Sequence, residues 1–259
     1  KEYKVYKLSS EFEKTSGKNY KLKVHNNPED YEENTPKLSK FFKNIGKNVQ
    51  VFVCGASRSA NYTLGILEQI KHTKIDVHYI RPDTELLIGK VKLQEKAIFG
   101  ILQEYARSGL FNSITLFSNP ALEQIIGNVP IKKYFDTINQ TIYYSVHYKN
   151  LFEHTKPIIG NLNKPSEVQK IRSIGRLDTN RIEENWFYRL DMERDVCYYF
   201  CISQEKLEKD GILHQKIIDK LKQKPRNAFK NLTYAIYESP YETDFGFCVA
   251  HTNAIQKNS

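Results

Sequence analysis

The chain has 259 residues, a formal net charge of +9, 40% hydrophobic residues and 27% charged residues, a composition typical of a folded protein with one large domain or two smaller ones. No apolar run approaches the roughly 20 residues that span a bilayer, and no signal peptide opens the sequence. These observations argue against membrane-spanning and secreted proteins and predict a cytoplasmic one. The sequence begins at Lys1 and not at a methionine, so we expect further residues upstream.

Basic residues are spread along the sequence and interleaved with Glu and Asp. This pattern is typical of a lysine-rich solvated surface and gives no specific nucleic-acid signal, although acidic partners and polyanionic ligands stay open. The four cysteines, Cys54, Cys197, Cys201 and Cys248, fall in expected strands and form no C-x-x-C pair. They are predicted to be buried thiols in a reducing compartment, and not metal ligands.

Period-2 alternation predicts short strands over residues 3–8 and 20–24. Turn residues predict a loop over 25–34, and a Thr-Pro start predicts a short helix over 35–42. An apolar strand is expected over 49–54.

The apolar strand runs into Gly55–Asn61 and then into a helix that begins at Tyr62. Such a junction offers free backbone N–H groups at a helix N-terminus, where phosphates bind in α/β proteins. The loop has one glycine, whereas a loop that wraps a polyphosphate usually needs several. A plain strand-to-helix turn is therefore an open alternative.

Strands and helices alternate through the middle of the chain. We expect strands over 74–80 and 113–117, a helix over 92–108 that stops at Gly109, and an unusually long helix over 134–152. This alternation predicts an α/β fold with a parallel sheet covered on both faces, and ligands at the carboxyl ends of its strands.

Past Gly160 the pattern changes. Strands are expected over residues 186–190, 196–202, 232–237 and 245–251, and one helix is expected over residues 204–221. That mixed order predicts a smaller α+β domain. We therefore expect a nucleotide-binding-type α/β domain over 1–133, a long core helix with its following loop over 134–175, and a C-terminal α+β domain over 176–259.

Five short motifs occur in the order in which the tubulin/FtsZ superfamily has them. Val51–Gly65 lies where that family has its G-G-G-T-G-[ST]-G loop, and Ile80–Glu85 resembles its T-R-P-F-x-F-E segment. Ser118–Leu122 resembles N-[DE]-x-L, which contacts ribose and base, and Asn26–Glu29 is similar to G-N-P-E, which approaches the phosphates. Phe247–Thr252 resembles the I-A-T-G end of FtsZ. The chain thus resembles a divergent tubulin/FtsZ-like protein with a Rossmann-like nucleotide-binding domain.

The resemblance implies a guanine nucleotide, GTP or GDP with Mg²⁺, as the ligand. Phe135 and Asn139 are similar to an aromatic-x-x-x-Asn pair of tubulin, in which the ring stacks on guanine and the amide pairs with the base edge. Positions four residues apart share one helix face, which suits that role. The other nucleotide-binding residues implied by the resemblance are Asn27, Gly55, Ala56, Ser57, Arg58, Ser59, Asn61, Arg81, Glu85 and Asn119.

Gly160–Val168 resembles the catalytic loop of the family, G-x-x-N-x-D-x-x-D, whose acids orient a water in the nucleotide site of the next subunit. Asn163 stands where the first acid would be, and the second is Ser166 or, with a one-residue shift, Glu167. The implied catalytic residues are Asn163 and Glu167, in a GTPase that acts across a subunit interface with weak or absent hydrolysis. The resemblance places Lys1 near the second strand of the family, so the family's first strand and glycine-rich loop are absent from this sequence, and whether an upstream segment supplies them stays open.

Several of these residues have structural alternatives. Phe135 could pack in the core, and Asn139 could be an exposed polar residue of the helix. Arg58 and Arg81 could be surface charges. Asn27 could belong to a turn, and Glu167 could be an acid at a helix start. The pairs Tyr143–Tyr144 and Tyr198–Tyr199 are expected to pack between helix and sheet.

Two functions follow from the resemblance. In the first, the protein binds guanine nucleotide and assembles head to tail with its own copies into filaments. In the second, it keeps the fold as a structural or assembly component without nucleotide chemistry, as the single-glycine loop and the missing acid favour. The Lys, Asn, Ile and Tyr richness would suit a phage. A third function, a dinucleotide-dependent or transferase enzyme on an unrelated fold, is disfavoured because no glycine fingerprint is followed by an acid ~20 residues later.

Overall fold

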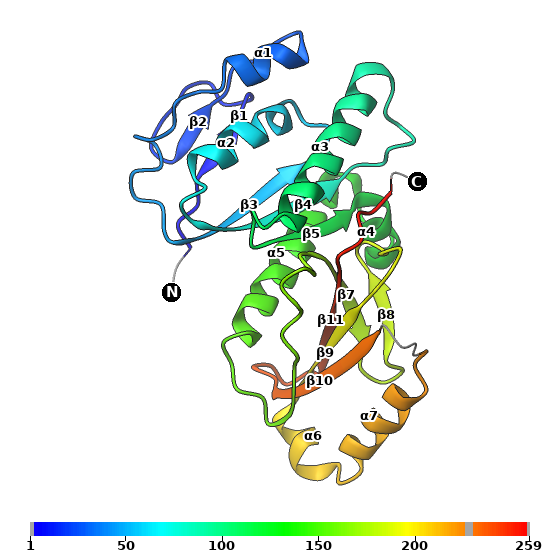
Figure 1. Cartoon of the computed structure of the whole chain (residues 1–259). Coiled ribbons are helices and arrows are strands. Elements are labelled where there is room, and N and C mark those ends of the chain that lie inside the picture. Colours follow the sequence, from blue (N-terminus) through cyan, green and yellow to red (C-terminus); the bar gives the residue numbers. More distant parts are fainter. Residues whose placement is uncertain (1–2, 226–229, 258–259) are drawn as a thin grey trace. The chain divides into compact units, whose positions relative to one another are not determined.

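The computed structural model describes residues 3–225 and 230–257, which fall into two compact units (Figure 1). The first unit runs to Thr115 and the second from Leu116 to Lys257, so the division lies within strand β5. The domain boundaries suggested by the sequence, after residues 133 and 175, stay predictions.

The described residues of the first unit form a small two-stranded sheet, a ladder of two parallel strands, and three α-helices with one 3₁₀ helix. Its elements are β1 (Lys7–Ser9), β2 (Asn19–Lys21), α1 (Pro28–Glu33), β3 (Asn48–Cys54), η1 (Arg58–Tyr62), α2 (Thr63–Gln69), β4 (Lys74–Arg81), α3 (Gly89–Arg107) and the start of β5 (Ser113–Ser118).

β3 and β4 form the parallel ladder that the alternation predicts. Val51 lies opposite Val77 in this ladder, and both strands are rich in the β-branched residues that favour a pleated, buried backbone. α3 packs on β4, with the ring centroids of Tyr79 and Phe99 5.5 Å apart. α3 stops as expected at Gly109, whose φ of +86° is the left-handed conformation of a helix stop. The carboxyl end of this ladder carries the candidate phosphate loop.

The helix expected over 35–42 is wrong, and α1 lies inside the segment expected to be a loop. α1 forms because this segment has two helix-start signals, a proline at the first position and acids in the first turn. These signals favour a helix more strongly than the turn-rich composition favours a loop. Thr35 closes α1 instead of starting a helix, because its hydroxyl donates to the carbonyl of Tyr31 at 3.0 Å. The N–H of Leu38 donates to the Gln69 side chain at 2.7 Å, so the following segment is held by a distant residue.

The second unit is a mixed sheet with helices. Its elements are the end of β5, α4 (Asn119–Ile126), η2 (Ile131–Lys133), α5 (Tyr134–Phe152), β6 (Ile159–Asn161), β7 (Ile171–Asp178), β8 (Glu183–Trp186), β9 (Asp195–Ile202), α6 (Gln204–Lys209), α7 (Leu213–Lys222), β10 (Asn231–Glu238) and β11 (Phe245–Thr252). The strand order is β7-β11-β9-β10-β6, with β8 paired to β7. β9 and β10 are parallel, whereas β11 is antiparallel to both β7 and β9.

α5 has the bounds that the sequence predicts and covers one face of this sheet. Its last residue, Phe152, lies 4.7 Å from Tyr237 and 6.0 Å from Phe247, measured between ring centroids. Phe247 stacks on Tyr199 at 4.2 Å, and Tyr198 and Tyr199 are both buried, as predicted. The strands expected over 196–202, 232–237 and 245–251 are confirmed, whereas the one expected over 186–190 lies at 183–186.

The single helix expected over 204–221 is wrong, because α6 and α7 are separate. Asp210 Oδ1 accepts the N–H of Ile212 at 3.2 Å, a local bond that competes with helical pairing, and Gly211 lies between them. α7 lies against the sheet face opposite α5, since His214 Nε2 hydrogen-bonds the hydroxyl of Tyr234 at 2.9 Å. Tyr234 and the α5-facing Tyr237 are three residues apart on β10 and therefore point to opposite faces.

Three cysteines are buried free thiols, as predicted. Burial raises the pKa of Cys197 to about 11, and Cys201 and Cys248 are fully enclosed. The prediction is wrong for Cys54, which is exposed at the last position of β3. Among residues 3–225 and 230–257, no helix has the length and apolarity to span a bilayer.

A row of buried polar side chains crosses the sheet of the second unit. His251 of β11 lies opposite Arg172 of β7 and Asp195 of β9, and all three are less than one tenth exposed. Burial, and then the charges of Arg172 and Lys149, lower the pKa of His251 well below its ordinary value of 6.5, against the opposing effect of a hydrogen bond with the Gln169 backbone. His251 is therefore neutral in the folded protein near neutral pH.

We expect the free energy of unfolding to fall as the pH drops below the unfolded-state pKa of 6.5, because the unfolded chain then binds a proton at His251 that the folded chain rejects. The slope from this residue is at most about 1.4 kcal/mol per pH unit. Urea titrations between about pH 7.5 and 5.5 measure it. The variant His251→Gln loses this part of the slope, and His72→Gln, at an exposed position, keeps it. Equal slopes for wild type and His251→Gln would contradict the assignment.

Candidate functional site

The loop after β3 is closed by its own hydrogen bonds. The N–H of Gly55 donates to the carbonyl of Ile80 at 2.8 Å, and the N–H of Ser57 donates to the carbonyl of Cys54 at 3.2 Å. The N–H of Ala60 donates to the Ser57 carbonyl at 3.0 Å and lies 3.2 Å from Ser57 Oγ, so Ser57 caps η1. Three of the amides that a phosphate would use are thus bonded within the chain.

The groups of this loop that stay available to a ligand are mostly side chains. Ala56 has a left-handed φ of +60°, which turns the chain out of β3. Ser59 Oγ lies 3.1 Å from Ser57 Oγ, and Asn61 is half-buried in η1. Arg58 is exposed, as its surface-charge alternative also expects, and its guanidinium has the geometry to bind a phosphate through two hydrogen bonds.

Gly55 is required for packing. A Cβ at this position would lie 2.6 Å from the hydroxyl of Tyr79 and 2.8 Å from Cδ of Pro82, closer than side chains tolerate. The Tyr79 hydroxyl cannot easily move aside, because it donates to Glu95 Oε1 at 3.2 Å inside the unit. The single glycine of the loop is explained by the strand next to it, without a bound phosphate.

Arg81 points into the unit, so the surface-charge alternative is wrong for it. Its side chain is 8% exposed, and its Nε donates to Glu95 Oε1 at 3.2 Å. The guanidinium carbon lies 4.3 Å from the ring centroid of Phe99. Since Glu95 is almost fully buried, Arg81 supplies the charge that keeps this carboxylate paired. Glu85 is exposed in the loop that follows β4, and its backbone N–H donates to Asp83 Oδ1.

Asn27 belongs to an element next to the β3 loop. It precedes α1, is exposed, and its Nδ2 donates to Asp30 Oδ2 at 3.3 Å. α1 contacts η1 through the rings of Tyr31 and Tyr62, whose centroids are 5.0 Å apart. The structure therefore brings Asn27 and the residues of the β3 loop to neighbouring elements of the first unit.

Asn119 holds an unsatisfied acceptor in the second unit. It opens α4, which Ser118 caps by accepting the N–H of Ala121 at 3.5 Å. Asn119 Oδ1 is buried and has no hydrogen-bond partner within the described chain. Leaving such an oxygen unpaired costs roughly 1–3 kcal/mol. A donor from a ligand, such as a ribose hydroxyl or a base N–H, would remove that cost, so the residue fits a nucleoside.

Phe135 and Asn139 lie on the solvent-facing side of the first turns of α5. Phe135 is 70% exposed and Asn139 is exposed too, whereas Ile138 and Ile142 on the other side of the helix are buried. The core-packing alternative is therefore wrong for Phe135. The pair Tyr143–Tyr144 is about half exposed, so its expected packing between helix and sheet is also wrong.

Asn163 and Glu167 are exposed on the segment between β6 and β7. The segment is held at its start, because Gly160 of β6 pairs with Ala235 of β10 and the N–H of Asn163 donates to Thr233 Oγ1 at 3.4 Å. A strand and not a helix follows, so the helix-start alternative for Glu167 is wrong.

A metal ion has no preformed site in the described part of the chain. There, no group of three or more His, Cys, Asp or Glu side chains is arranged to hold one. A Mg²⁺ ion that accompanies a nucleotide takes much of its coordination from phosphate oxygens and water, so such an ion would not need one.

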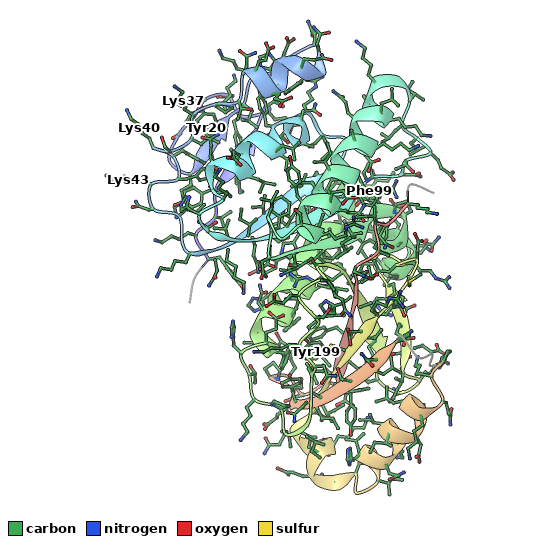
Figure 2. The ribbon with its side chains drawn as sticks, viewed as in Figure 1. Tyr20, Lys37, Lys40, Lys43, Phe99 and Tyr199 are labelled. Carbon is green, nitrogen blue, oxygen red and sulfur yellow. The ribbon has the colours of Figure 1, made fainter. Side chains whose placement is uncertain are left out.

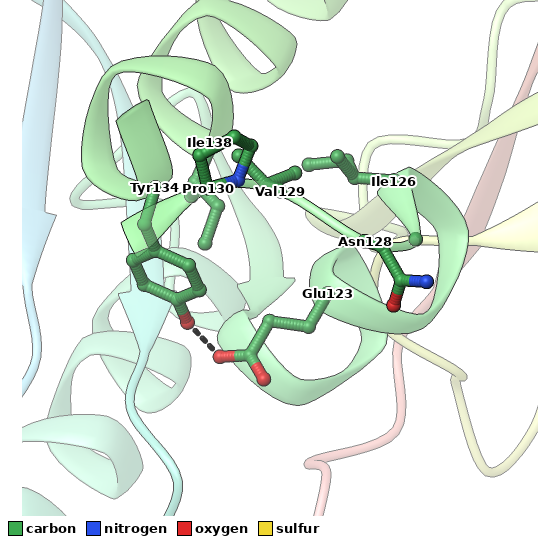
Figure 3. A pocket seen from close by; sticks show the side chains of 8 residues that line it. Glu123, Ile126, Asn128, Val129, Pro130, Tyr134 and Ile138 are labelled. Atoms are coloured by element: carbon green, nitrogen blue, oxygen red, sulfur yellow. Dashed lines mark hydrogen bonds between the residues drawn. The ribbon is translucent and has the colours of Figure 1, made fainter. Parts of the chain in front are cut away.

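Pattern reasoning misses two features. One is the buried group of Tyr79, Arg81 and Glu95 beneath the β3 loop, for which the sequence signal is a glutamate on the apolar side of α3. The other is a pocket of about 490 Å³ between the end of α4 and the start of α5 (Figure 3). Glu123 and Tyr134 both line it, and the Tyr134 hydroxyl donates to Glu123. No motif marks this pocket.

No protein-family model and no curated protein matches the sequence. The fold is similar to two structures of TubZ from Bacillus thuringiensis serovar israelensis, a GTPγS-form protofilament and GDP-form protofilaments. The first has a TM-score of 0.56 at 12% identity over 81% of this chain and 62% of that chain. The second has a TM-score of 0.55 at 12% identity over 81% of this chain and 64% of that chain.

The fold is also similar to an empty FtsZ dimer from M. jannaschii, with a TM-score of 0.59 at 14% identity over 87% of this chain and 70% of that chain. The chain thus has a tubulin/FtsZ-like α/β fold, as its motif order predicts, and spans less than two thirds of the TubZ chains.

The close approach at Gly55 yields a matched pair of variants. Gly55→Ala is expected to lower the free energy of unfolding by about 1–3 kcal/mol, because the added methyl group overpacks against Tyr79 and Pro82. Gly100→Ala, inside α3 with no atom near the added methyl, is expected to raise it by up to ~1 kcal/mol. Urea unfolding measures both. A Gly55→Ala protein as stable as wild type would contradict the packing role of this glycine.

Proposed function

We propose that the protein binds a guanine nucleotide and assembles head to tail with copies of itself in the cytoplasm, with weak or absent hydrolysis. The observation that carries the proposal is the buried Oδ1 of Asn119, which has no hydrogen-bond partner in the described part of the chain and lies in the segment that resembles the ribose and base contact of the tubulin/FtsZ superfamily. The tubulin/FtsZ-like fold supports the same ligand. A bound nucleotide would supply the donor that Asn119 lacks.

In this proposal, Phe135 and Asn139 recognise the base. Their exposure on one side of α5 leaves a ring free to stack on a purine and an amide free to pair with its edge. An amide carries both a donor and an acceptor, as does the edge of guanine, so Asn139 selects by hydrogen bonding and Phe135 contributes stacking. Neither side chain contributes to the core, so their substitution tests binding without a large loss of stability.

In this proposal, the residues that recognise the phosphates lie in the first unit. They are the loop 55–61, Asn27, Arg81 and Glu85. Because Gly55, Ser57 and Ala60 use their amides internally, the loop binds phosphates chiefly through side chains, above all Arg58 and the hydroxyls of Ser57 and Ser59. Arg81 acts by holding Glu95 beneath the loop.

Assembly would bring Asn163 and Glu167 of one copy to the nucleotide of the next. Both are exposed on a segment anchored at its start, which suits insertion into another copy. The TubZ structures of similar fold are protofilaments, which supports self-association. An asparagine amide cannot take a proton from water, so only Glu167 could act as a base and hydrolysis is slow.

Loss of the base contacts should weaken nucleotide binding. We expect the double variant Phe135→Ala/Asn139→Ala to bind a fluorescent GTP analogue roughly 5- to 150-fold more weakly than wild type, the range that corresponds to ~1–3 kcal/mol of stacking on a base. Asn119→Ala is expected to weaken it as well. Fluorescence anisotropy measures the affinities. Tyr143→Ala/Tyr144→Ala, which removes two other half-exposed rings from α5, is the control and keeps wild-type affinity. Equal binding by all four proteins would contradict the proposal.

The second function, an assembly component without nucleotide chemistry, is favoured by one observation: the amides of the β3 loop are bonded within the chain. Sedimentation with and without GTP separates the two functions. The proposed function requires pelleting that depends on GTP and is lost in Phe135→Ala/Asn139→Ala. Pelleting that is the same with and without GTP, in a protein that binds no GTP, assigns the second function.

A further inference from the structure

A long stretch of the first unit departs from the interleaving of basic and acidic residues. Between Glu33 and Glu68 the sequence has no acidic residue and holds four lysines and one arginine. Lys37, Lys40 and Lys43 occur three residues apart within it. Residues 220–237 of the second unit also lack an acidic residue, but there Lys224 and Lys230 form ion pairs with Glu184 and Glu193.

The backbone that carries these three lysines is firmly held although it is not helical. Leu38 and Phe42 are buried, and the N–H of Leu38 donates to Gln69 Oε1 at 2.7 Å. Phe41 packs edge-on against Tyr20, with ring centroids 5.3 Å apart. The apolar residues between the lysines are thus turned inward and fix the segment to the unit.

Lys37, Lys40 and Lys43, here called the basic surface, are all exposed. Figure 2 shows them along the same side of the first unit, with their side chains directed away from the ribbon. Within the described residues none of the three forms an ion pair or a side-chain hydrogen bond, and the salt bridges found there begin only at Glu68. Three cationic groups are therefore presented together and uncompensated.

The surroundings of the basic surface distinguish between classes of partner. Between Val24 and Phe52, no large apolar side chain of the described chain is exposed. Protein–protein interfaces have an apolar or aromatic centre, which the segment that carries the three lysines does not supply. Nucleic acid offers closely and regularly spaced phosphates and is bound by lysines without any apolar contact.

We propose that the basic surface binds the phosphate backbone of nucleic acid without reading its sequence. The three ammonium groups replace cations condensed on the phosphates, and the release of those cations drives binding, so affinity falls steeply with salt. The surface is separate from the residues assigned to the guanine nucleotide, and the proposal stands whether or not the protein binds GTP.

The test measures binding of the full chain to a labelled, mixed-sequence DNA duplex by fluorescence anisotropy over a series of salt concentrations. In Lys37→Gln/Lys40→Gln/Lys43→Gln, we expect weaker binding and a slope of log K against log salt that is smaller by about 2.7, at about 0.9 per lost phosphate contact. Lys37→Arg/Lys40→Arg/Lys43→Arg is expected to bind as wild type, because it keeps the three charges. Circular dichroism checks that each variant is folded.

The matched control is Lys90→Gln/Lys92→Gln/Lys96→Gln, which removes three exposed lysines from α3 of the same unit and changes the net charge equally. We expect it to keep most of the affinity and the wild-type slope. Equal losses in the two triple glutamine variants would overturn the proposal, since net charge alone would then explain binding. Polyglutamate that competes as well as DNA at equal charge would also overturn it, in favour of an acidic protein.

Discussion

The close approach of the Gly55 backbone to the Tyr79 ring is the constraint on which the candidate phosphate loop depends. The Tyr79 hydroxyl donates to Glu95, and Arg81 pairs with the same buried carboxylate. β3 ends at Cys54, directly before this close approach. The amides of Gly55, Ser57 and Ala60 in the loop donate to the carbonyls of Ile80, Cys54 and Ser57. Gly55, which resembles a glycine of a phosphate-binding loop, is thus explained by packing.

The two sets of candidate residues differ in how available they are to a ligand. Phe135 and Asn139 are exposed, and the buried Oδ1 of Asn119 has no hydrogen-bond partner among residues 3–225 and 230–257, whereas the amides of the β3 loop are largely bonded within the first unit. If a nucleotide binds, recognition of the base is better preserved than recognition of the phosphates. A tubulin/FtsZ-like fold at 12–14% identity is compatible with such a change, because a fold is retained by its core while sites change residue by residue.

Much of this fold can be predicted from hydrophobic patterns. The strands at 49–54 and 74–80 and the helix at 134–152 have strong periodicity, and the structure confirms them. The helix expected at 35–42 rests on a local start signal, which contacts with Gln69, distant in sequence, override. For the same reason the inward direction of Arg81 cannot be read from its motif, since its partner Glu95 lies on another element. The exposure of Phe135 likewise depends on which side of α5 is covered.

The guanine-nucleotide content of the purified full-length protein tests the central claim most directly. The protein is denatured, and the released nucleotides are separated and quantified by ion-exchange chromatography, before and after incubation with GTP. The account predicts guanine nucleotide close to one equivalent per chain and little adenine nucleotide. A folded protein that releases none as purified, and takes up none from added GTP, would contradict it.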